Sequence, residues 1–278
     1  MDRLQDLWKR ISRNKLSRVG LLMVFLSLSG ALLGPFFVPY DPHEISVLEC
    51  YNSPSLAHPL GTDGYGRDLL SRIIYGGRIS LLVGFSVMCF TAALGTPLGL
   101  LAGYYPNMDG PIMRVMDALM AFPAILLALA LMTAMGPTLS NTVIALGIVY
   151  TPRVARTVRA SVLSVKNIEF VEAAQVQGAT DLRILLRHIL PNCLSPLVVQ
   201  ETFIFAYAIL AESSLSFVGA GVPPPAPSWG NILSDGRVCM REAPWITIFP
   251  GLAVALTVLG LNLLGDGIRD ALDPRMKV

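Results

Sequence analysis

The sequence carries little charge for its length. Of its 278 residues, 14% are Asp, Glu, Lys or Arg, whereas 53% are hydrophobic, and the mean hydropathy is +0.59. A soluble domain carries about 25% charged residues, so this composition excludes an ordinary water-soluble domain and favours a protein that lies in lipid. The net charge of +2 is too small to indicate a nucleic-acid partner.

Lysine is scarce, and its placement excludes an ATP-binding loop. The phosphate-binding loop of ATPases requires Gly-Lys-Ser/Thr after a glycine-rich turn. No lysine here follows a glycine; the four are Lys9, Lys15, Lys166 and Lys277. If the activity uses ATP and Mg²⁺, we therefore expect another chain to bind them.

Metal-binding and catalytic patterns are also missing. The three histidines, His43, His58 and His188, are scattered, and no Cys or His cluster has the spacing of metal ligands. The sequence has no nucleophile elbow and no paired-carboxylate pattern, and Ser213 has no adjacent histidine to activate it. We expect neither an enzyme nor a chain with a cofactor or metal of its own.

Long apolar runs are the main feature that is present. A bilayer core about 30 Å thick needs roughly 20 mostly apolar residues in a spanning helix. The sequence therefore predicts an all-α polytopic membrane protein with six transmembrane helices. A small-residue stretch at 29–31 loosely resembles a signal cleavage site, but the apolar run continues past it, so we expect the first span to be retained. The runs are residues 19–38, 79–104, 115–135, 141–160, 194–218 and 246–265.

The fourth run is the least apolar because it holds three arginines. Arg153, Arg156 and Arg159 are three residues apart, so they share one face of a helix. We expect the second half of this helix to leave the membrane on the cytoplasmic side.

The basic residues predict the orientation. With six spans and the N-terminus inside, 16 of the 21 Lys and Arg residues fall in cytoplasmic segments and five in outer ones. The positive-inside rule supports this arrangement. It predicts a cytoplasmic N-terminus.

The terminal and outer segments have distinct compositions. Residues 1–18 predict a basic amphipathic lead-in on the cytoplasmic face, and 269–278 a cytoplasmic tail. Residues 39–78 predict an outer segment rich in turns, with an interfacial helix from Arg67 onward. Between these segments lies a five-helix core at residues 79–268.

The core is interrupted by a cytoplasmic hairpin at 166–191 and a proline-rich outer loop at 219–245. In the hairpin, Gly178 suits a helix C-cap because glycine enters the left-handed region freely. Thr180 is a candidate N-cap for a second helix, 181–190, with Asp181 in its first turn and Pro191 at its end. From the residues alone, this helix–turn–helix either lies passively on the membrane or is gripped by a partner.

Polar residues inside spans indicate function by default. Glu201, Glu212 and Ser213 lie in the fifth run and are candidates for a translocation path. The alternative is that they form hydrogen bonds between helices that fix packing. Asp117 and Pro123 share the third run, where a fixed proline kink is the favoured interpretation.

Two cysteines fall on the outer side, where the compartment is oxidising. Cys50 and Cys239 lie on the two outer segments. We hypothesise a disulfide between them; two independent thiols are the alternative.

The hairpin also resembles a known family. Its pattern, E-A-A, three residues, Gly, nine residues, an apolar residue, any residue, Leu-Pro, is similar to the cytoplasmic motif of ABC importer permeases. The apolar position is occupied by His188 here. Residues 58–81, 212–230 and 250–275 resemble the C-type subunit of dipeptide, oligopeptide and nickel permeases. The resemblance implies ATPase-coupling residues at Glu172, Ala173, Ala174, Gly178, His188, Leu190 and Pro191.

The resemblance implies a type I ABC importer permease in the inner plasma membrane of a bacterium, which moves di- or oligopeptides inward by alternating access. Its implied partners are a homologous permease, two cytoplasmic ATPases that bind ATP and Mg²⁺, and an extracytoplasmic solute-binding protein. A nickel-complex or glutathione-type importer is an alternative. Two rivals are a membrane scaffold without transport and a proton-coupled secondary transporter that uses Asp117, Glu201 or Glu212.

Overall fold

A computed structural model describes residues 14–272. This part of the chain is helical and contains no β-strand, only an isolated bridge between Thr62 and Asp68. The long helices are α2 (Lys15–Leu33), α3 (Leu69–Tyr104), α6 (Leu139–Val165), α9 (Leu190–Phe217) and α11 (Trp245–Leu272). The shorter ones are α4 (Pro106–Met120), α5 (Ala124–Met135), α7 (Glu169–Val176), α8 (Asp181–Ile184) and α10 (Trp229–Val238).

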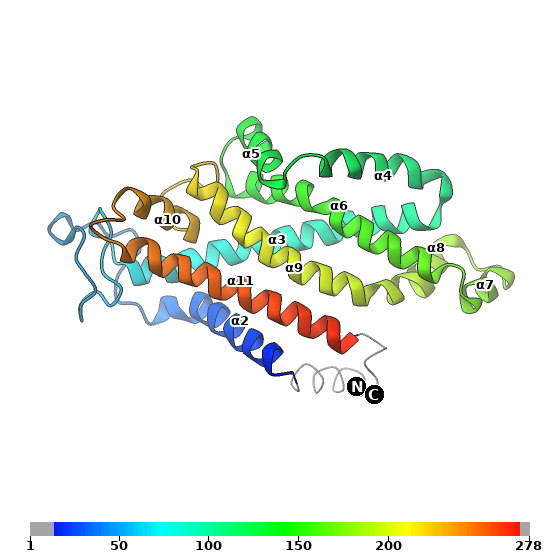
Figure 1. Ribbon diagram of the computed structural model, residues 1–278, viewed down its shortest axis with the longest axis horizontal. Coiled ribbons are helices and arrows are strands. Elements are labelled where there is room, and N and C mark those ends of the chain that lie inside the picture. The colour runs from blue at the N-terminus through cyan, green and yellow to red at the C-terminus, as the bar shows by residue number, and fades with distance from the viewer. Residues whose placement is uncertain (1–13, 273–278) are drawn as a thin grey trace.

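The long helices run side by side along the longest axis of the molecule (Figure 1). Helix α2 packs on α11, α11 on α9, and α9 on both α3 and α6. Helices α7 and α8 lie at the same end as the start of α2 and the end of α11 (Figure 1). Helix α10 and the segment between α2 and α3 lie at the opposite end (Figure 1).

Within residues 14–272, four helical segments are long and apolar enough to span a membrane, or up to five if α4 and α5 count as one span. The four segments are Lys15–Phe36, Leu69–Tyr104, Asp181–Phe217 and Trp245–Leu272. Helix α6 is not among these four segments, because its arginines lower its hydropathy. At 27 residues it is about 40 Å long, which leaves room for one end to extend beyond the hydrocarbon core.

Two expectations about the spans are wrong in detail. The third span is not one kinked helix, because α4 and α5 meet at 90° around residues 121–123, and Pro123 caps α5. The interfacial helix before the second span is not separate, because α3 begins at Leu69 and continues without a break to Tyr104. Its first turns are packed inside the protein, where Leu69 and Arg72 are almost fully buried.

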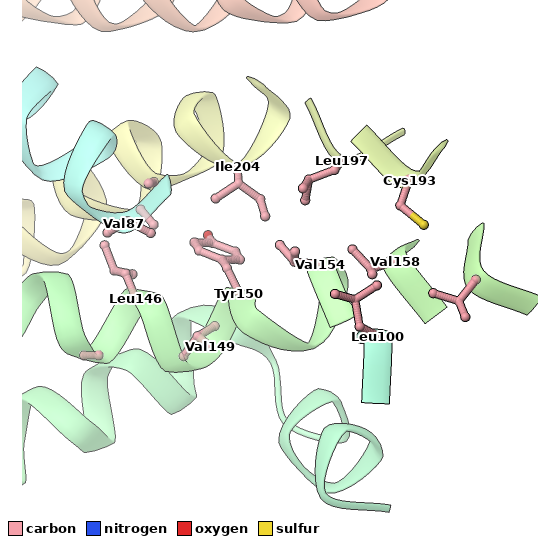
Figure 2. Packing of buried hydrophobic residues seen from close by; sticks show 14 of the residues in the cluster. Val87, Leu100, Leu146, Val149, Tyr150, Val154, Val158, Cys193, Leu197 and Ile204 are labelled. Atoms are coloured by element: carbon pink, nitrogen blue, oxygen red, sulfur yellow. The ribbon is translucent and has the colours of Figure 1, made fainter. Parts of the chain in front are cut away.

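The main core lies between α3, α6 and α9. Figure 2 shows Leu146, Tyr150 and Val154 of α6 facing Val87 of α3 and Ile204 of α9. Burial of such aliphatic side chains contributes about 1.5–3 kcal/mol each, an upper range in a membrane, where lipid tails are also apolar.

Helices α3 and α6 approach closely through a row of small residues. Gly95, Gly99 and Gly103 are spaced four apart on α3. A Cβ at Gly99 would lie 2.5 Å from the Ala155 carbonyl oxygen and 2.7 Å from Val158 Cβ. Small residues at this spacing let the two backbones approach each other, as is common between helices in membranes.

Candidate functional site

The hairpin that the sequence places in the cytoplasm joins α6 to α9 and is fixed to the core along its inner face. Helix α6 ends at Val165, and Lys166 donates through Nζ to the carbonyl oxygen of Gly103 at 3.0 Å. Helix α7 follows, and its Val171 and Ala174 side chains are buried against the core cluster. The hairpin is therefore anchored on the same helices that form the main core.

The opposite surface of the hairpin is exposed and carries both polar and large apolar side chains. Glu172 and Ala173 are exposed. Five large apolar side chains of the hairpin are exposed as well, with Val176 at 89% and Leu182 at 67%. Exposed apolar side chains that gather on a surface are common where another protein binds. The five are Ile168, Phe170, Val176, Leu182 and Leu186.

The bend between α7 and α8 has the predicted cap. Gly178 has φ +77°, in the left-handed region. The Gly178 N–H donates to the Gln175 carbonyl, and the Ala179 N–H to the Ala174 carbonyl at 3.0 Å, which is the 6→1 bond of a Schellman cap. Thr180 occupies the N-cap position of α8, but its side chain makes no capping hydrogen bond there.

The expectation that Pro191 ends the second helix is wrong. Helix α8 passes through a π-helical turn, Leu185–Ile189, directly into α9, where Pro191 lies in the first turn. Proline lacks a backbone N–H and is tolerated at such a position, and a π-turn absorbs the change in hydrogen-bond register. The hairpin and the fifth span therefore form one continuous segment, Asp181–Phe217.

The last predicted coupling residues lie on this continuous segment. His188 is half-buried within the π-turn, and Asn192 Nδ2 donates to its carbonyl oxygen at 2.7 Å. Leu190 packs partly against the core, and Pro191 is exposed. The structure thus groups Glu172, Ala173 and Gly178 on the exposed bend, with Ala174 beneath them.

A clamp that the sequence did not reveal ties the hairpin to the α3–α4 corner. Tyr104 Oη donates to Asp181 Oδ1 at 2.9 Å, and Tyr105 Oη to Asp181 Oδ2 at 3.0 Å. Burial and the hydrogen bond to Asp181 raise the pKa of Tyr105 above its ordinary value, so its hydroxyl remains a donor at neutral pH. The only sequence signal was the tyrosine pair directly before α4, and its partner Asp181 lies 76 residues farther along the chain.

The candidate path residue Glu212 has partners inside the chain. Its carboxylate is fully buried and accepts from Ser80 Oγ of α3 at 3.0 Å and from Ser216 Oγ at 2.8 Å. Ser80 in turn accepts from the Trp229 N–H at the start of α10. The neighbouring Ser213 Oγ is buried without a partner among residues 14–272. This geometry supports the packing interpretation, because Glu212 joins three helices.

Glu201 and Asp117 differ from Glu212. Glu201 Oε2 accepts from Thr91 Oγ1 at 2.9 Å, and Oε1 is buried without a partner in the described part of the chain. Asp117 is mostly exposed and forms an ion pair with Arg156. Glu201 therefore keeps one buried carboxylate oxygen without a hydrogen bond inside the described part of the chain.

The outer segments meet in a charged cluster. Asp63 pairs with Arg67 and Arg72, and both arginines also contact Asp235 of α10. A cavity of about 410 Å³ opens beside this cluster. It is lined by Tyr65, Asn231, Ser234 and the three prolines Pro223, Pro224 and Pro225.

The hypothesised disulfide is not formed in the structure. Cys50 and Cys239 are free thiols. Cys50 Sγ donates to the Ser46 carbonyl, and Cys239 Sγ to the Asp235 and Gly236 carbonyls. Burial raises the pKa of the Cys239 thiol, which keeps it protonated. Between residues 14 and 272, no three His, Cys, Asp or Glu side chains gather closely enough to hold a metal ion.

Comparison with known proteins identifies the family. Residues 95–278 match the family described as "Binding-protein-dependent transport system inner membrane component". Residues 3–54 match "N-terminal TM domain of oligopeptide transport permease C". The first match alone covers more than half of the chain.

Several curated proteins are similar over nearly their whole length. A putative peptide transport system permease of Brucella suis is 50% identical, over 97% of this chain and 91% of that protein. A dipeptide transport system permease of Alkalihalophilus pseudofirmus is 44% identical, over 98% and 90%. A glutathione transport system permease of Pectobacterium atrosepticum is also 44% identical, over 98% and 91%.

The fold also has a solved counterpart. An inward-facing structure of the MetNI methionine ABC transporter matches with a TM-score of 0.61 and 19% sequence identity, over 73% of this chain and 97% of that one. This likeness concerns the fold alone, which is that of a type I importer permease. Fold, sequence and hairpin agree: the chain belongs to the multi-pass inner membrane components of binding-protein-dependent transport systems, among the C-type permeases.

Proposed function

We propose that this chain is the permease subunit of an ATP-driven importer that moves di- or oligopeptides inward by alternating access. The observation that carries the proposal is the hairpin, whose inner face is anchored in the core while its outer face exposes a bend and five large apolar side chains. Such a surface is suited to fit a groove of a cytoplasmic ATPase. With no Gly-Lys-Ser/Thr loop in the sequence, ATP and Mg²⁺ are bound by that partner.

The described contacts provide a route for force. The hairpin is continuous with α9 and is clamped through Asp181 to the corner that joins α3 and α4. A displacement of the hairpin by closing ATPases would therefore move α9, α3 and α4 together. Two coupled states of this kind are the basis of alternating access, with the path between this chain and a homologous permease.

The outer end supplies the surface for a solute-binding protein. The Asp63–Arg67–Arg72–Asp235 cluster and the adjoining cavity lie at the end opposite the hairpin. The mixed charges suit a polar, reversible contact.

Peptide cargo is proposed from the relatives, whose names specify peptides, dipeptides and glutathione, itself a tripeptide. The test is uptake by the complete importer in proteoliposomes, with labelled dipeptides, longer peptides, glutathione and a nickel complex in separate reactions. We expect saturable peptide uptake that requires both ATP and the binding protein. Preferred uptake of the nickel complex would overturn the peptide assignment.

The same assay separates the proposal from a proton-coupled transporter. A proton-coupled carrier would continue to transport when ATP is depleted and a proton gradient is imposed. We expect transport to stop under those conditions. Co-purification of an ATPase with the chain, reduced by the exposed-face substitution Val176→Asp, would support docking at the hairpin; undiminished co-purification would count against it.

A further inference from the structure

One arginine in the middle of α6 is held by two aromatic rings. Arg153 Cζ lies 5.2 Å from the ring centroid of Tyr150 and 5.2 Å from that of Tyr207 on α9. Both distances are within the range of cation–π contacts. Tyr150 is 6% exposed and belongs to the core shown in Figure 2, whereas Tyr207 is 40% exposed. The guanidinium is therefore positioned against the core but remains open on one side.

Arg153 lies far from both ends of its helix. It is the fifteenth of the 27 residues of α6, about 20 Å from the outer end. Tyr207 lies about 15 Å from the outer end of α9. Both groups thus lie within the length of their helices and not at the ends. A charged side chain that lies within the bilayer is costly against lipid and faces the protein interior or a water-filled path.

The neighbouring arginines have carboxylate partners, and Arg153 does not. Arg156 pairs with Asp117, and Arg159 pairs with Asp109 through two hydrogen bonds. Among residues 14–272, no acidic side chain forms an ion pair with Arg153, and its guanidinium donates no hydrogen bond. Because the cation–π contacts do not use the guanidinium N–H groups as hydrogen-bond donors, these groups remain free, and their planar fork matches a carboxylate in a bidentate geometry.

The surface around Arg153 is a polar strip that crosses from α6 to α9. Thr157 lies one turn farther along α6, and its Oγ1 is 3.4 Å from Gln200 Oε1 of α9. Gln200 and Tyr207 are seven residues apart and share one face of α9. The strip therefore offers a cation, an amide and an aromatic ring on the two helices that connect directly to the hairpin.

We propose that Arg153, positioned by Tyr150 and Tyr207, binds the carboxylate of a peptide cargo as it passes between the two permeases. This inference rests on the proposed function and deepens it, since it assigns a contact for the cargo along the path between the two permeases. A carboxylate supplied by a side chain of the partner permease is the competing occupant, and the experiment separates the two.

The first test compares two peptides of one sequence, a free acid and its C-terminal amide, both without acidic side chains. Arg153→Gln is measured in the reconstituted complete importer, with Arg114→Gln, an exposed arginine of α4, as the matched control. We expect Arg153→Gln to raise the KM for the free acid at least about tenfold, as loss of a charge-assisted pair does. Uptake of the amide changes less than about twofold, and Arg153→Lys restores part of the difference.

The second test does not depend on whether the binding protein accepts the amide. A photoreactive benzoylphenylalanine replaces Tyr207, with Leu252 of α11, 51% exposed, as the control position. Illumination during ATP-driven transport should attach labelled free-acid peptide at 207 and not at 252. Adding Arg153→Gln to the same chain should reduce the adduct.

Several results would overturn the proposal. An equal loss of uptake for both peptides, with dissociation of the permease pair, would assign the guanidinium to a carboxylate of the partner permease. An unchanged KM, or an adduct at 207 that Arg153→Gln does not reduce, would remove the cargo contact. A wild-type importer without ATP-dependent uptake would instead reject the proposed function, so the two failures are distinguishable.

Discussion

Gly178 shows how one backbone angle determines the shape of the proposed docking surface. At φ +77° a side chain is strained whatever the surrounding space, and no atom lies within 4 Å of an added Cβ. We therefore predict that Gly178→Ala costs about 1–2 kcal/mol through the backbone alone and weakens binding of the ATPase. The measurement is ATPase retained during purification, together with peptide uptake per assembled complex.

Gly110 provides a matched control. It also has open space around an added Cβ, but it lies inside α4 with an ordinary helical φ. Gly110→Ala should be neutral or stabilise by up to about 1 kcal/mol. If both substitutions have the same effect on ATPase retention, the left-handed conformation of Gly178 is not what matters.

Local signals at single residues were readable from the sequence. Glycine at 178 predicted the cap because few other residues adopt that conformation. The distant partners of Asp181 and Arg153 were not readable from the sequence. Tyr104 and Tyr105 lie 77 and 76 residues from Asp181, and Tyr207 lies 54 residues from Arg153. Such contacts depend on how helices pack, which periodicity does not specify.

At the scale of elements, the tyrosine clamp is the testable link between hairpin and spans. We predict that Asp181→Asn, or Tyr104→Phe combined with Tyr105→Phe, leaves the complex assembled but lowers the number of peptides moved per ATP hydrolysed. The reason is that two hydrogen bonds, worth about 1 kcal/mol each, connect the hairpin to the α3–α4 corner. The measurement is uptake and ATP hydrolysis in the same proteoliposomes.

Tyr75→Phe is the control for loss of a tyrosine hydroxyl. Tyr75 lies on α3 near the opposite end, and its hydroxyl makes no hydrogen bond within residues 14–272. It should leave the ratio of peptide to ATP unchanged. Equal ratios for the clamp variants and for wild type would show that force reaches the spans through α9 alone.

The helices themselves could be predicted better than their joints. Each apolar run corresponds to a helix or a pair of helices, because burial in lipid and core requires a continuous apolar length. The joints were predicted poorly. A proline signals a break, yet Pro123 lies at a 90° bend and Pro191 in a continuous helix. The difference arises from the preceding π-turn, which no spacing of side chains reveals.

At the scale of the whole molecule, we predict that its two ends lie on opposite sides of the membrane. The hairpin lies with the start of α2 and the end of α11, and the charged cluster lies at the other end (Figure 1). The predicted topology assigns sixteen of the 21 basic residues to segments on the hairpin side, and basic loops stay in the cytoplasm. We therefore predict that residue 56 faces outward and residue 107 faces the cytoplasm.

Single cysteines test this orientation in a chain whose four native cysteines are replaced. Leu56, in the outer segment, is fully exposed, and Asn107, at the α3–α4 corner, is also exposed. A maleimide that cannot cross membranes should label Leu56→Cys in intact spheroplasts, and Asn107→Cys only after permeabilisation. Labelling in the reverse order would invert the topology and place the hairpin outside, where no ATPase could reach it. This one measurement therefore tests both the orientation predicted from the basic residues and the proposed docking of an ATPase at the hairpin.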